Sequence, residues 1–140
     1  MKYINIEISN PKKELYLIED DNHKHYLAIK NKGEDIKRYA YIDDKIKERI
    51  KESLTSHWHN RRKGITTLID IRDEERHRIG YIEIKFHSDR WSGDRVILSL
   101  EFYTGDSKVC GNSIERSIEI EKAHLNIVQS RVLYKYLNNI

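Results

Sequence analysis

The chain has 140 residues, of which 38% are hydrophobic and 35% are charged, and its formal net charge is +3. This balance is too apolar for a disordered chain and too charged for a membrane protein, so we expect a soluble globular protein. The longest apolar run, residues 96–102, is far shorter than the roughly 20 residues of a membrane-spanning helix. The small basic excess is also not that of a dedicated duplex-DNA binder, so any polyanion contact must come from local clustering of charge.

The first residues and the cysteine content bear on where the protein acts. Residues 1–8 alternate polar and apolar side chains, whereas a secretion signal has a basic stretch and then a continuous apolar core. Cys110 is the single cysteine, so no internal disulfide can form. We therefore expect a cytoplasmic protein with no membrane contact.

The first half of the sequence predicts four strands and a helix. Apolar and polar residues alternate with the period of half-buried strands, which we expect at residues 4–8, 14–19, 25–30 and 36–42. Either Asp43 or Asp44 can cap the helix that follows. Apolar residues then recur every fourth position and predict a stripe that packs against the sheet: Ile46, Ile50, Leu54 and Trp58.

The second half repeats this order. We expect strands at residues 65–71, 82–86 and 96–102, and then a glycine-containing connection at residues 104–112. Residues 117–121 alternate like a fourth strand, although residues 113–122 could instead begin the last helix. From Ala123 to the C-terminus, helical spacing predicts an apolar stripe of Leu125, Val128, Val132, Leu133, Tyr136 and Leu137.

These patterns predict the α+β class, with antiparallel sheets, two packed helices and a ββββα unit that occurs twice. At this length, one domain of residues 1–140 is the simplest organisation, and it can consist of half-units at residues 1–60 and 61–140. Unpaired strands at the edges of such sheets recruit further strands, so we also expect that a homodimer can form.

Asp70, Glu83 and Lys85 form the first candidate site. If their strands form one hairpin, we expect Asp70 to lie opposite Glu83 on the polar face, with Lys85 two residues further along. Opposed carboxylates can hold Mg²⁺ or Mn²⁺, and a nearby lysine can orient or deprotonate an attacking water. The pattern resembles the D…ExK core of the PD-(D/E)xK nucleases, which implies catalytic roles for these residues and a further ligand at Glu48 or Glu52. Unlike that family, this chain has no proline before Asp70.

The second candidate site is basic and aromatic. Residues 57–64 combine an indole with a run of basic side chains, and Arg90, Trp91 and Arg95 in a later hairpin can extend such a surface. Arginine and lysine beside an aromatic ring can combine phosphate contacts with base stacking, which suits single strands. The residues that we expect to contact nucleic acid are Arg61, Arg62, Lys63, Tyr81, Lys85, Arg90, Trp91, Arg95 and Tyr103.

The repeated ββββα layout resembles that of the PUR and whirly families, and residues 81–85 followed by residues 93–97 are similar to a strand pair of the PUR repeat. This resemblance implies a non-catalytic protein that needs no cofactor and binds single-stranded DNA or RNA, or a complex that contains nucleic acid. Abundant Ile, Lys, Asn and Tyr suggest an AT-rich genome, such as that of a phage or mobile element. A rival hypothesis is therefore an anti-defence inhibitor that docks on a host protein, and a metal-dependent nuclease is a further alternative.

Overall fold

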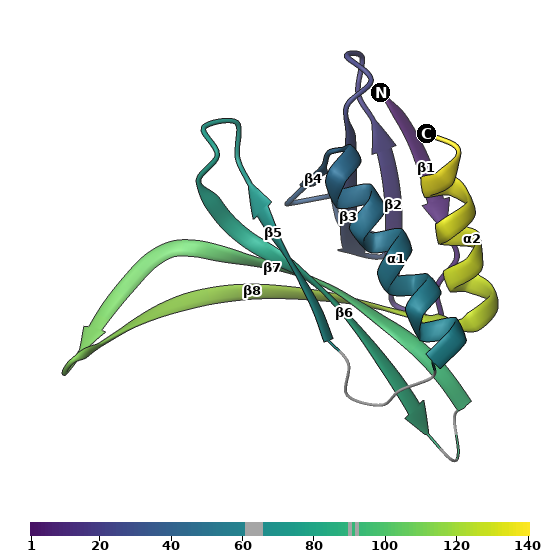
Figure 1. The fold of residues 1–140 in the computed structure, drawn as a ribbon. Helices are drawn as coiled ribbons and strands as arrows, with labels where there is room; N and C mark the ends of the chain where they lie inside the picture. The colour runs from purple at the N-terminus through teal and green to yellow at the C-terminus, as the bar shows by residue number, and fades with distance from the viewer. Residues whose placement is uncertain (61–65, 90, 92) are drawn as a thin grey trace.

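Two four-stranded antiparallel sheets and two helices make up the fold (Figure 1). The computed structural model describes residues 1–60, 66–89, 91 and 93–140. The first unit consists of β1 (Lys2–Ile6), β2 (Lys13–Glu19), β3 (His25–Asn31), β4 (Ala40–Ile42) and α1 (Asp44–Asn60). The second unit consists of β5 (Thr66–Arg72), β6 (Arg78–Asp89), β7 (Gly93–Cys110), β8 (Ser113–Asn126) and α2 (Ile127–Asn138). The strands of each sheet are ordered as in the sequence, so the predicted α+β class with two ββββα units is confirmed.

Alternating side chains give each sheet a core face and an opposite face. In β2, Leu15 and Leu17 are buried in the main core, whereas Tyr16 points to the other side. Across the β1–β2 ladder, Ile6 lies opposite Leu15, so apolar residues of neighbouring strands meet on the core face. The period of two in the sequence thus sets which face of a sheet is buried.

The helices pack against each other, and each contacts both sheets. α1 contacts β4, β5 and β6, whereas α2 contacts β1, β7 and β8. The indole nitrogen of Trp58 on α1 donates a hydrogen bond of 3.0 Å to the hydroxyl of Ser130 on α2, and its ring meets the Tyr134 ring edge-on at 5.2 Å. Trp58 therefore joins the two helices. No helix in the described part of the chain has the length and apolar character that a membrane crossing requires.

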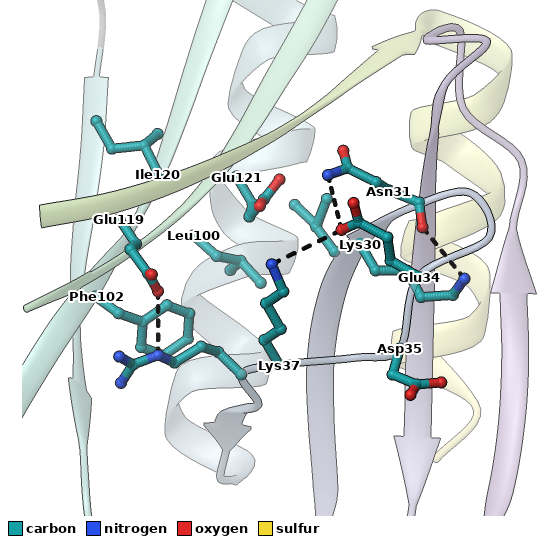
Figure 2. Close-up of a pocket in the computed structure, with 12 residues that line it drawn as sticks. Lys30, Asn31, Glu34, Asp35, Lys37, Leu100, Phe102, Glu119, Ile120 and Glu121 are labelled. Carbon is teal, nitrogen blue, oxygen red and sulfur yellow. Dashed lines mark hydrogen bonds and ion pairs between the residues drawn. The ribbon is translucent and has the colours of Figure 1, made fainter. Parts of the chain in front are cut away.

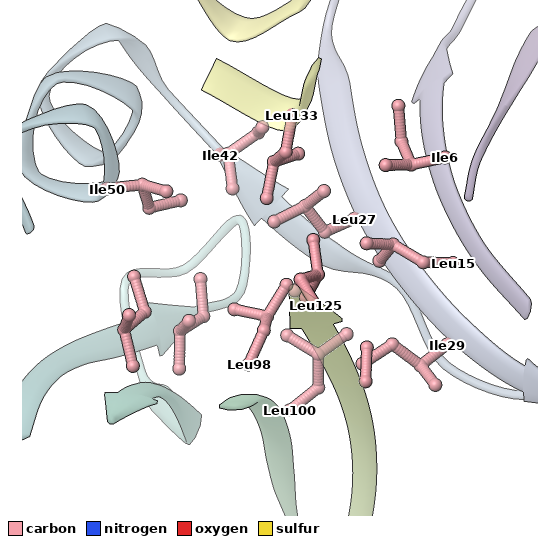
Figure 3. Close-up of a cluster of buried hydrophobic side chains, with 14 of the residues drawn as sticks. Ile6, Leu15, Leu27, Ile29, Ile42, Ile50, Leu98, Leu100, Leu125 and Leu133 are labelled. Carbon is pink, nitrogen blue, oxygen red and sulfur yellow. The ribbon is translucent and has the colours of Figure 1, made fainter. Parts of the chain in front are cut away.

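One hydrophobic core joins the two units. Figure 3 shows Leu27 of the first sheet close to Leu98 of the second sheet and Leu133 of α2. At the rim of this core, the backbone N–H of Ser9 donates a hydrogen bond of 2.7 Å to the carbonyl oxygen of His124 on β8. The two halves of the chain thus bury one another's apolar side chains.

The last helix begins later than the sequence pattern indicates, because residues 123–126 belong to β8. Asn126 is the N-cap of α2: its side chain accepts a hydrogen bond of 2.8 Å from the backbone N–H of Gln129. The Gln129 side chain accepts one of 3.0 Å from the backbone N–H of Asn126. This capping box fixes the start of the helix. The prediction of a helix from Ala123 was therefore wrong at its first turn.

The buried face of α2 also differs from the expected stripe. Ser130, Leu133 and Leu137 are buried, whereas Val128 and Val132 are 69% and 39% exposed. The helix turns its Ser130 side toward the core because Trp58 of α1 packs there. An apolar strip of α2 is left on the surface as a result.

Strand lengths depart from expectation in both sheets. The glycine-containing segment at residues 104–112 is not an irregular connection: β7 and β8 continue through it as a long hairpin arm, which extends to the left in Figure 1. Gly111, with φ of 62°, takes the left-handed conformation at the turn of this arm. In the first sheet, β4 covers only the end of the expected strand at residues 36–42.

Candidate nucleic-acid interface

The second sheet has one face toward the core and one face away from both helices. Ile82, Ile84 and Phe86 of β6 are buried in the core, so the residues that alternate with them lie on the opposite side. We call that side the open face. Across the ladders its central rows are Asp70–Tyr81–Glu101–Ile120, Leu68–Glu83–Ser99–Lys122 and Thr66–Lys85–Ile97–His124.

The register separates Asp70 from Glu83. Asp70 lies opposite Tyr81, whereas Glu83 lies opposite Leu68. The prediction that Asp70 faces Glu83 was therefore wrong, because the hairpin turns at residues 73–77, earlier than the pattern indicated. Glu83 and Lys85 do share the open face, as expected from their spacing.

The partners of Asp70 are two arginines. Its carboxylate lies 3.0 Å from the guanidinium of Arg72 and 3.8 Å from that of Arg78. Among the described residues, the one group of three or more possible metal ligands with mutually close donor atoms is in the β5–β6 turn and consists of Asp73, Glu75 and His77. This arrangement gives the nuclease hypothesis no support.

A buried carboxylate lies in the middle of the open face. Glu101 is only 7% exposed, and its Oε1 accepts a hydrogen bond of 3.0 Å from the Tyr81 hydroxyl. Burial raises the pKa of Tyr81, and its hydrogen bond to Glu101 raises that pKa further. Tyr81 is therefore fixed in place on the sheet by its hydroxyl group.

One end of the open face carries a cationic patch, which we define as Lys85, His87, Arg95, Lys122 and His124. His87 lies opposite Arg95, and Lys85 and His124 flank the same residue of β7. Burial lowers the pKa of His124, and the positive charges of Arg95, Lys122 and His87 lower it further. The positive charges that gather around His124 create a positive potential, which favours an anion such as a phosphate.

Of the residues predicted to contact nucleic acid, Tyr81, Lys85, Arg95 and Tyr103 lie on the open face. Trp91, in the turn that follows the cationic patch, is 92% exposed. Tyr103 lies toward the other end of the face, where the guanidinium of Arg78 is 5.6 Å from its ring. Tyr81 lies between these two positions. The other predicted contacts, Arg61, Arg62, Lys63 and Arg90, fall outside the described residues.

The sequence analysis did not include Lys122 and His124 among the binding residues, because the pattern placed residue 124 in a helix. In a helix, neither side chain would lie on the same sheet face as Lys85. A strand assignment through residue 126 would have placed both on the face of Lys85 by alternation alone.

The sequence analysis also missed an aromatic surface on the first sheet, which we call the tyrosine face. Tyr3, Tyr16, Tyr26 and Tyr41 come from successive strands and point away from the core, and Tyr39 lies just before β4. Ring centroids are 6.4 Å apart for Tyr3 and Tyr16 and 5.6 Å apart for Tyr26 and Tyr41. The available signal was again alternation, because Tyr16 and Tyr41 each stand between two apolar core residues.

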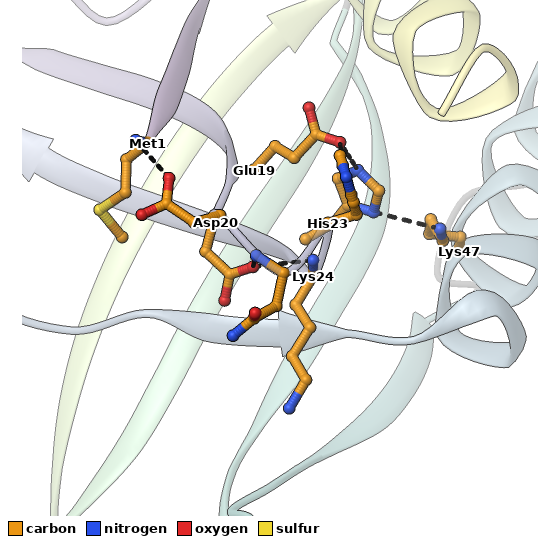
Figure 4. A network of polar contacts seen from close by, with 9 residues as sticks. Met1, Glu19, Asp20, His23, Lys24 and Lys47 are labelled. Carbon is orange, nitrogen blue, oxygen red and sulfur yellow. Dashed lines mark hydrogen bonds and ion pairs between the residues drawn. The ribbon is translucent and has the colours of Figure 1, made fainter.

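A buried lysine lies near the start of α1 (Figure 4). Lys47 is 7% exposed, and its Nζ lies 2.8 Å from the carboxylate of Asp44 and 3.4 Å from Nδ1 of His25. The hydrogen bond from Lys47 lowers the pKa of Asp44. On its other side, His25 lies 3.5 Å from the carboxylate of Glu19. Paired charges of this kind account for a buried lysine without a ligand.

A pocket lies between the β3–β4 connection and strands β7 and β8 (Figure 2). Phe102 contributes to its apolar lining. Two pairs of its charged residues contact each other: Nε of Arg38 lies 3.3 Å from Glu119, and Nζ of Lys37 lies 3.8 Å from Glu34. Lys30 and Glu121 form ion pairs with Glu14 and Lys13 of the first sheet. The pocket therefore offers less free charge to an anion than the cationic patch does.

Of these surfaces, the open face combines clustered positive charge with aromatic rings. Known proteins give no independent guide to it, because no protein-family model, curated protein or solved structure matches the chain. Its chemistry therefore has to be argued from its own residues.

Proposed function

We propose that this protein binds single-stranded nucleic acid, alone or within a complex, through the open face of its second sheet, and that it acts by binding and not by catalysis. The observation that carries the proposal is the cationic patch on a sheet face that no helix covers, with Tyr81 and Trp91 close by. Lysine and arginine contact phosphates, whereas aromatic rings stack on bases in a way that tolerates many sequences. We place this activity in the cytoplasm, in keeping with a chain whose single cysteine forms no internal disulfide.

A single strand suits the open face better than a duplex. Asp70, Glu83 and Glu101 interrupt the positive charge along the face, so a rigid duplex with regular rows of phosphates would meet both signs of charge. A flexible strand can place its phosphates at the cationic patch and its bases over exposed rings.

Fluorescence anisotropy with a labelled oligonucleotide of about 12 nucleotides tests the proposal over a range of salt concentrations. Lys85 and Lys122 are exposed members of the cationic patch, so their replacement by glutamate leaves the core untouched. The matched control is Lys45→Glu/Lys135→Glu, which changes the net charge equally on exposed positions of the two helices.

We expect the wild-type protein to bind the single strand more tightly than a duplex of the same length. Lys85→Glu/Lys122→Glu should weaken binding at least about tenfold and reduce the slope of log K against log salt by roughly 1.4, about 0.7 for each lost phosphate contact, whereas the control should bind like the wild type. Equal losses in both variants, or no binding by the wild type at about 50 mM salt, would contradict the proposal.

Docking on a host protein is a second candidate, because the tyrosine face is a poor match for a polyanion. Beside it, Glu14 and Lys30 form an ion pair of 3.2 Å. Lys24 contacts the Tyr41 ring and Asp20 accepts a hydrogen bond from the Tyr26 hydroxyl, so these charges also offset each other and the face is nearly neutral. Tyrosine is enriched at protein interfaces. If this candidate holds, Tyr3→Ser/Tyr39→Ser abolishes capture of one defined host protein, and the cationic-patch variant does not.

A further inference from the structure

Two carboxylates lie on neighbouring strands at the centre of the open face. Glu83 follows Tyr81 by two residues on β6, and Tyr81 lies directly opposite Glu101 on β7. Burial raises the pKa of Tyr81, and so do its hydrogen bond to Glu101 and the negative charges of Glu101 and Glu83. Both carboxylates therefore lie near the hydroxyl group of Tyr81, which keeps its proton and donates it to Glu101.

The carboxylate of Glu101 has one oxygen without a hydrogen-bond partner. Its Oε1 accepts the hydrogen bond from Tyr81, whereas its Oε2 is buried and has no hydrogen-bond partner among the described residues. The side chain lies on the open face and not in the hydrophobic core, although Glu101 is only 7% exposed. A buried carboxylate oxygen without a donor is unfavourable, so a ligand that donates an N–H group to Oε2 is favoured.

The neighbours of Glu101 allow a ligand to reach it. Ile120 lies directly opposite Glu101 on β8. Its side chain is 49% exposed and lies outside the hydrophobic core, so it can change rotamer freely. The side chain of Glu83 is partly exposed and forms neither an ion pair nor a hydrogen bond with a described residue. A ligand that moves Ile120 aside therefore meets two carboxylates that still have acceptor capacity.

The donors that a DNA strand can offer to these carboxylates lie on its bases, because phosphate groups only accept hydrogen bonds. The Watson–Crick edge of guanine has two adjacent donors, N1–H and the N2 amino group, which match the two oxygens of one carboxylate. Adenine and cytosine each have one amino group next to an acceptor. Thymine has a single N–H between two carbonyl oxygens, which a carboxylate repels. Guanine is therefore the base that suits a carboxylate best.

We propose that Glu101 selects guanine in a bound single strand by accepting hydrogen bonds from N1–H and the N2 amino group of the base. This inference rests on the proposed function, since it names the base that the open face selects. Lys122 of the cationic patch shares a cross-strand row with Glu83, and that row adjoins the row of Tyr81 and Glu101. A strand with its phosphates at the patch thus brings its bases to Glu101, where the negative charge of Glu83 disfavours the carbonyl oxygens of thymine.

Fluorescence anisotropy with three oligonucleotides of about 12 nucleotides tests the base selection. The first contains only thymine, the second has guanine at every third position, and the third has inosine at the same positions. Inosine keeps N1–H but lacks the N2 amino group. Lithium chloride serves as the salt, because lithium does not support guanine quadruplexes. We expect the wild type to bind the guanine oligonucleotide at least about fivefold more tightly than either of the others.

Glu101→Gln keeps an acceptor for Tyr81 but turns an amino group toward the base. This variant should bind the guanine and thymine oligonucleotides with affinities that differ by less than about twofold. The matched control is Glu7→Gln, which removes the same charge from an exposed position just after β1 and should keep the preference for guanine. The inosine comparison uses the wild type alone, so it does not depend on the folding of any variant.

A wild type that does not distinguish guanine from inosine, or a Glu101→Gln variant that prefers guanine as strongly as Glu7→Gln does, would overturn the inference. Equal binding of all three oligonucleotides by the wild type would remove the base selection and leave the proposed function standing. A wild type that binds none of them would contradict both.

Discussion

The hydroxyl of Tyr81 donates a hydrogen bond of 3.0 Å to Oε1 of Glu101, which lies directly opposite it across the β6–β7 ladder. This contact ties an aromatic ring of the proposed binding face to a carboxylate that is 7% exposed. Because a buried carboxylate needs donors, the orientation of Tyr81 is set by the fold and precedes any contact with a ligand.

Tyr81→Phe should lower the free energy of unfolding by about 1 to 2 kcal/mol, because it removes the donor to Glu101 and keeps the ring. Urea denaturation monitored by circular dichroism measures this loss. Tyr3→Phe is the matched control: its hydroxyl contacts two exposed groups, the sulfur of Met1 at 3.3 Å and the Tyr39 side chain, and its removal should change stability by less than about 0.5 kcal/mol. Equal losses in the two variants would show that Glu101 does not depend on Tyr81.

Gly80 of β6 lies directly against the backbone of β7. A Cβ atom at this position would lie 1.9 Å from the carbonyl oxygen of Glu101, which belongs to the backbone and cannot rotate away. Gly80→Ala should therefore cost at least about 2 kcal/mol of stability. Gly33→Asn should cost less than about 1 kcal/mol, because no atom lies within 4 Å of its Cβ position and asparagine tolerates the left-handed conformation. A Gly80→Ala protein as stable as Gly33→Asn in urea would show that the β6–β7 register is incorrect.

The burial of His57 predicts how the stability of the fold changes with pH. It is buried on α1 and stacks on Phe86 with ring centroids 5.5 Å apart, and burial lowers its pKa. The unfolded chain takes up a proton near pH 6.5, whereas the folded chain holds His57 neutral to lower pH, so stability falls as the pH drops below about 6.5. His57→Phe keeps a stacked ring and should lose less stability than the wild type between pH 7.5 and pH 5.5, as measured by thermal denaturation. An unchanged pH dependence in His57→Phe would show that other groups cause it.

The fold class followed from the sequence because alternation and helical spacing are local properties. Ile82, Ile84 and Phe86 mark the core face of their strand whatever its neighbours are. The start of α2 could not be obtained in this way, because the apolar pattern continues from strand into helix and the boundary is set by the side chains of Asn126 and Gln129.

The candidate site was partly predictable for the same reason. Tyr81 and Lys85 share a face because their spacing is even, and this holds for any register. The position of Asp70 relative to Glu83 depends on where the hairpin turns, which alternation does not specify. His124 could be assigned to the site only from the structure, which places its segment in strand β8.

The surroundings of His124 predict that the protein takes up protons when it binds nucleic acid. A phosphate bound at the cationic patch favours the charged imidazole and raises a pKa that burial and the neighbouring Arg95, Lys122 and His87 have lowered. Affinity should therefore increase as the pH falls from about 8 to about 6, and His124→Ala should flatten this dependence. His23→Ala, an exposed histidine in the turn between β2 and β3, serves as the control and should behave like the wild type. The same steep pH dependence in His124→Ala would place the phosphate elsewhere.

The central claim, that single-stranded nucleic acid binds on the open face, is tested most directly by titrating the ¹⁵N-labelled protein with an oligonucleotide of about 12 nucleotides and following the backbone amide signals. We predict that the largest chemical-shift changes occur at Lys85, Arg95, Ile97, Lys122 and His124, together with the indole N–H of Trp91, and that the amides of α1 and α2 change little. Shifts confined to the helices or to the tyrosine face, or no shifts at low salt, would contradict the account.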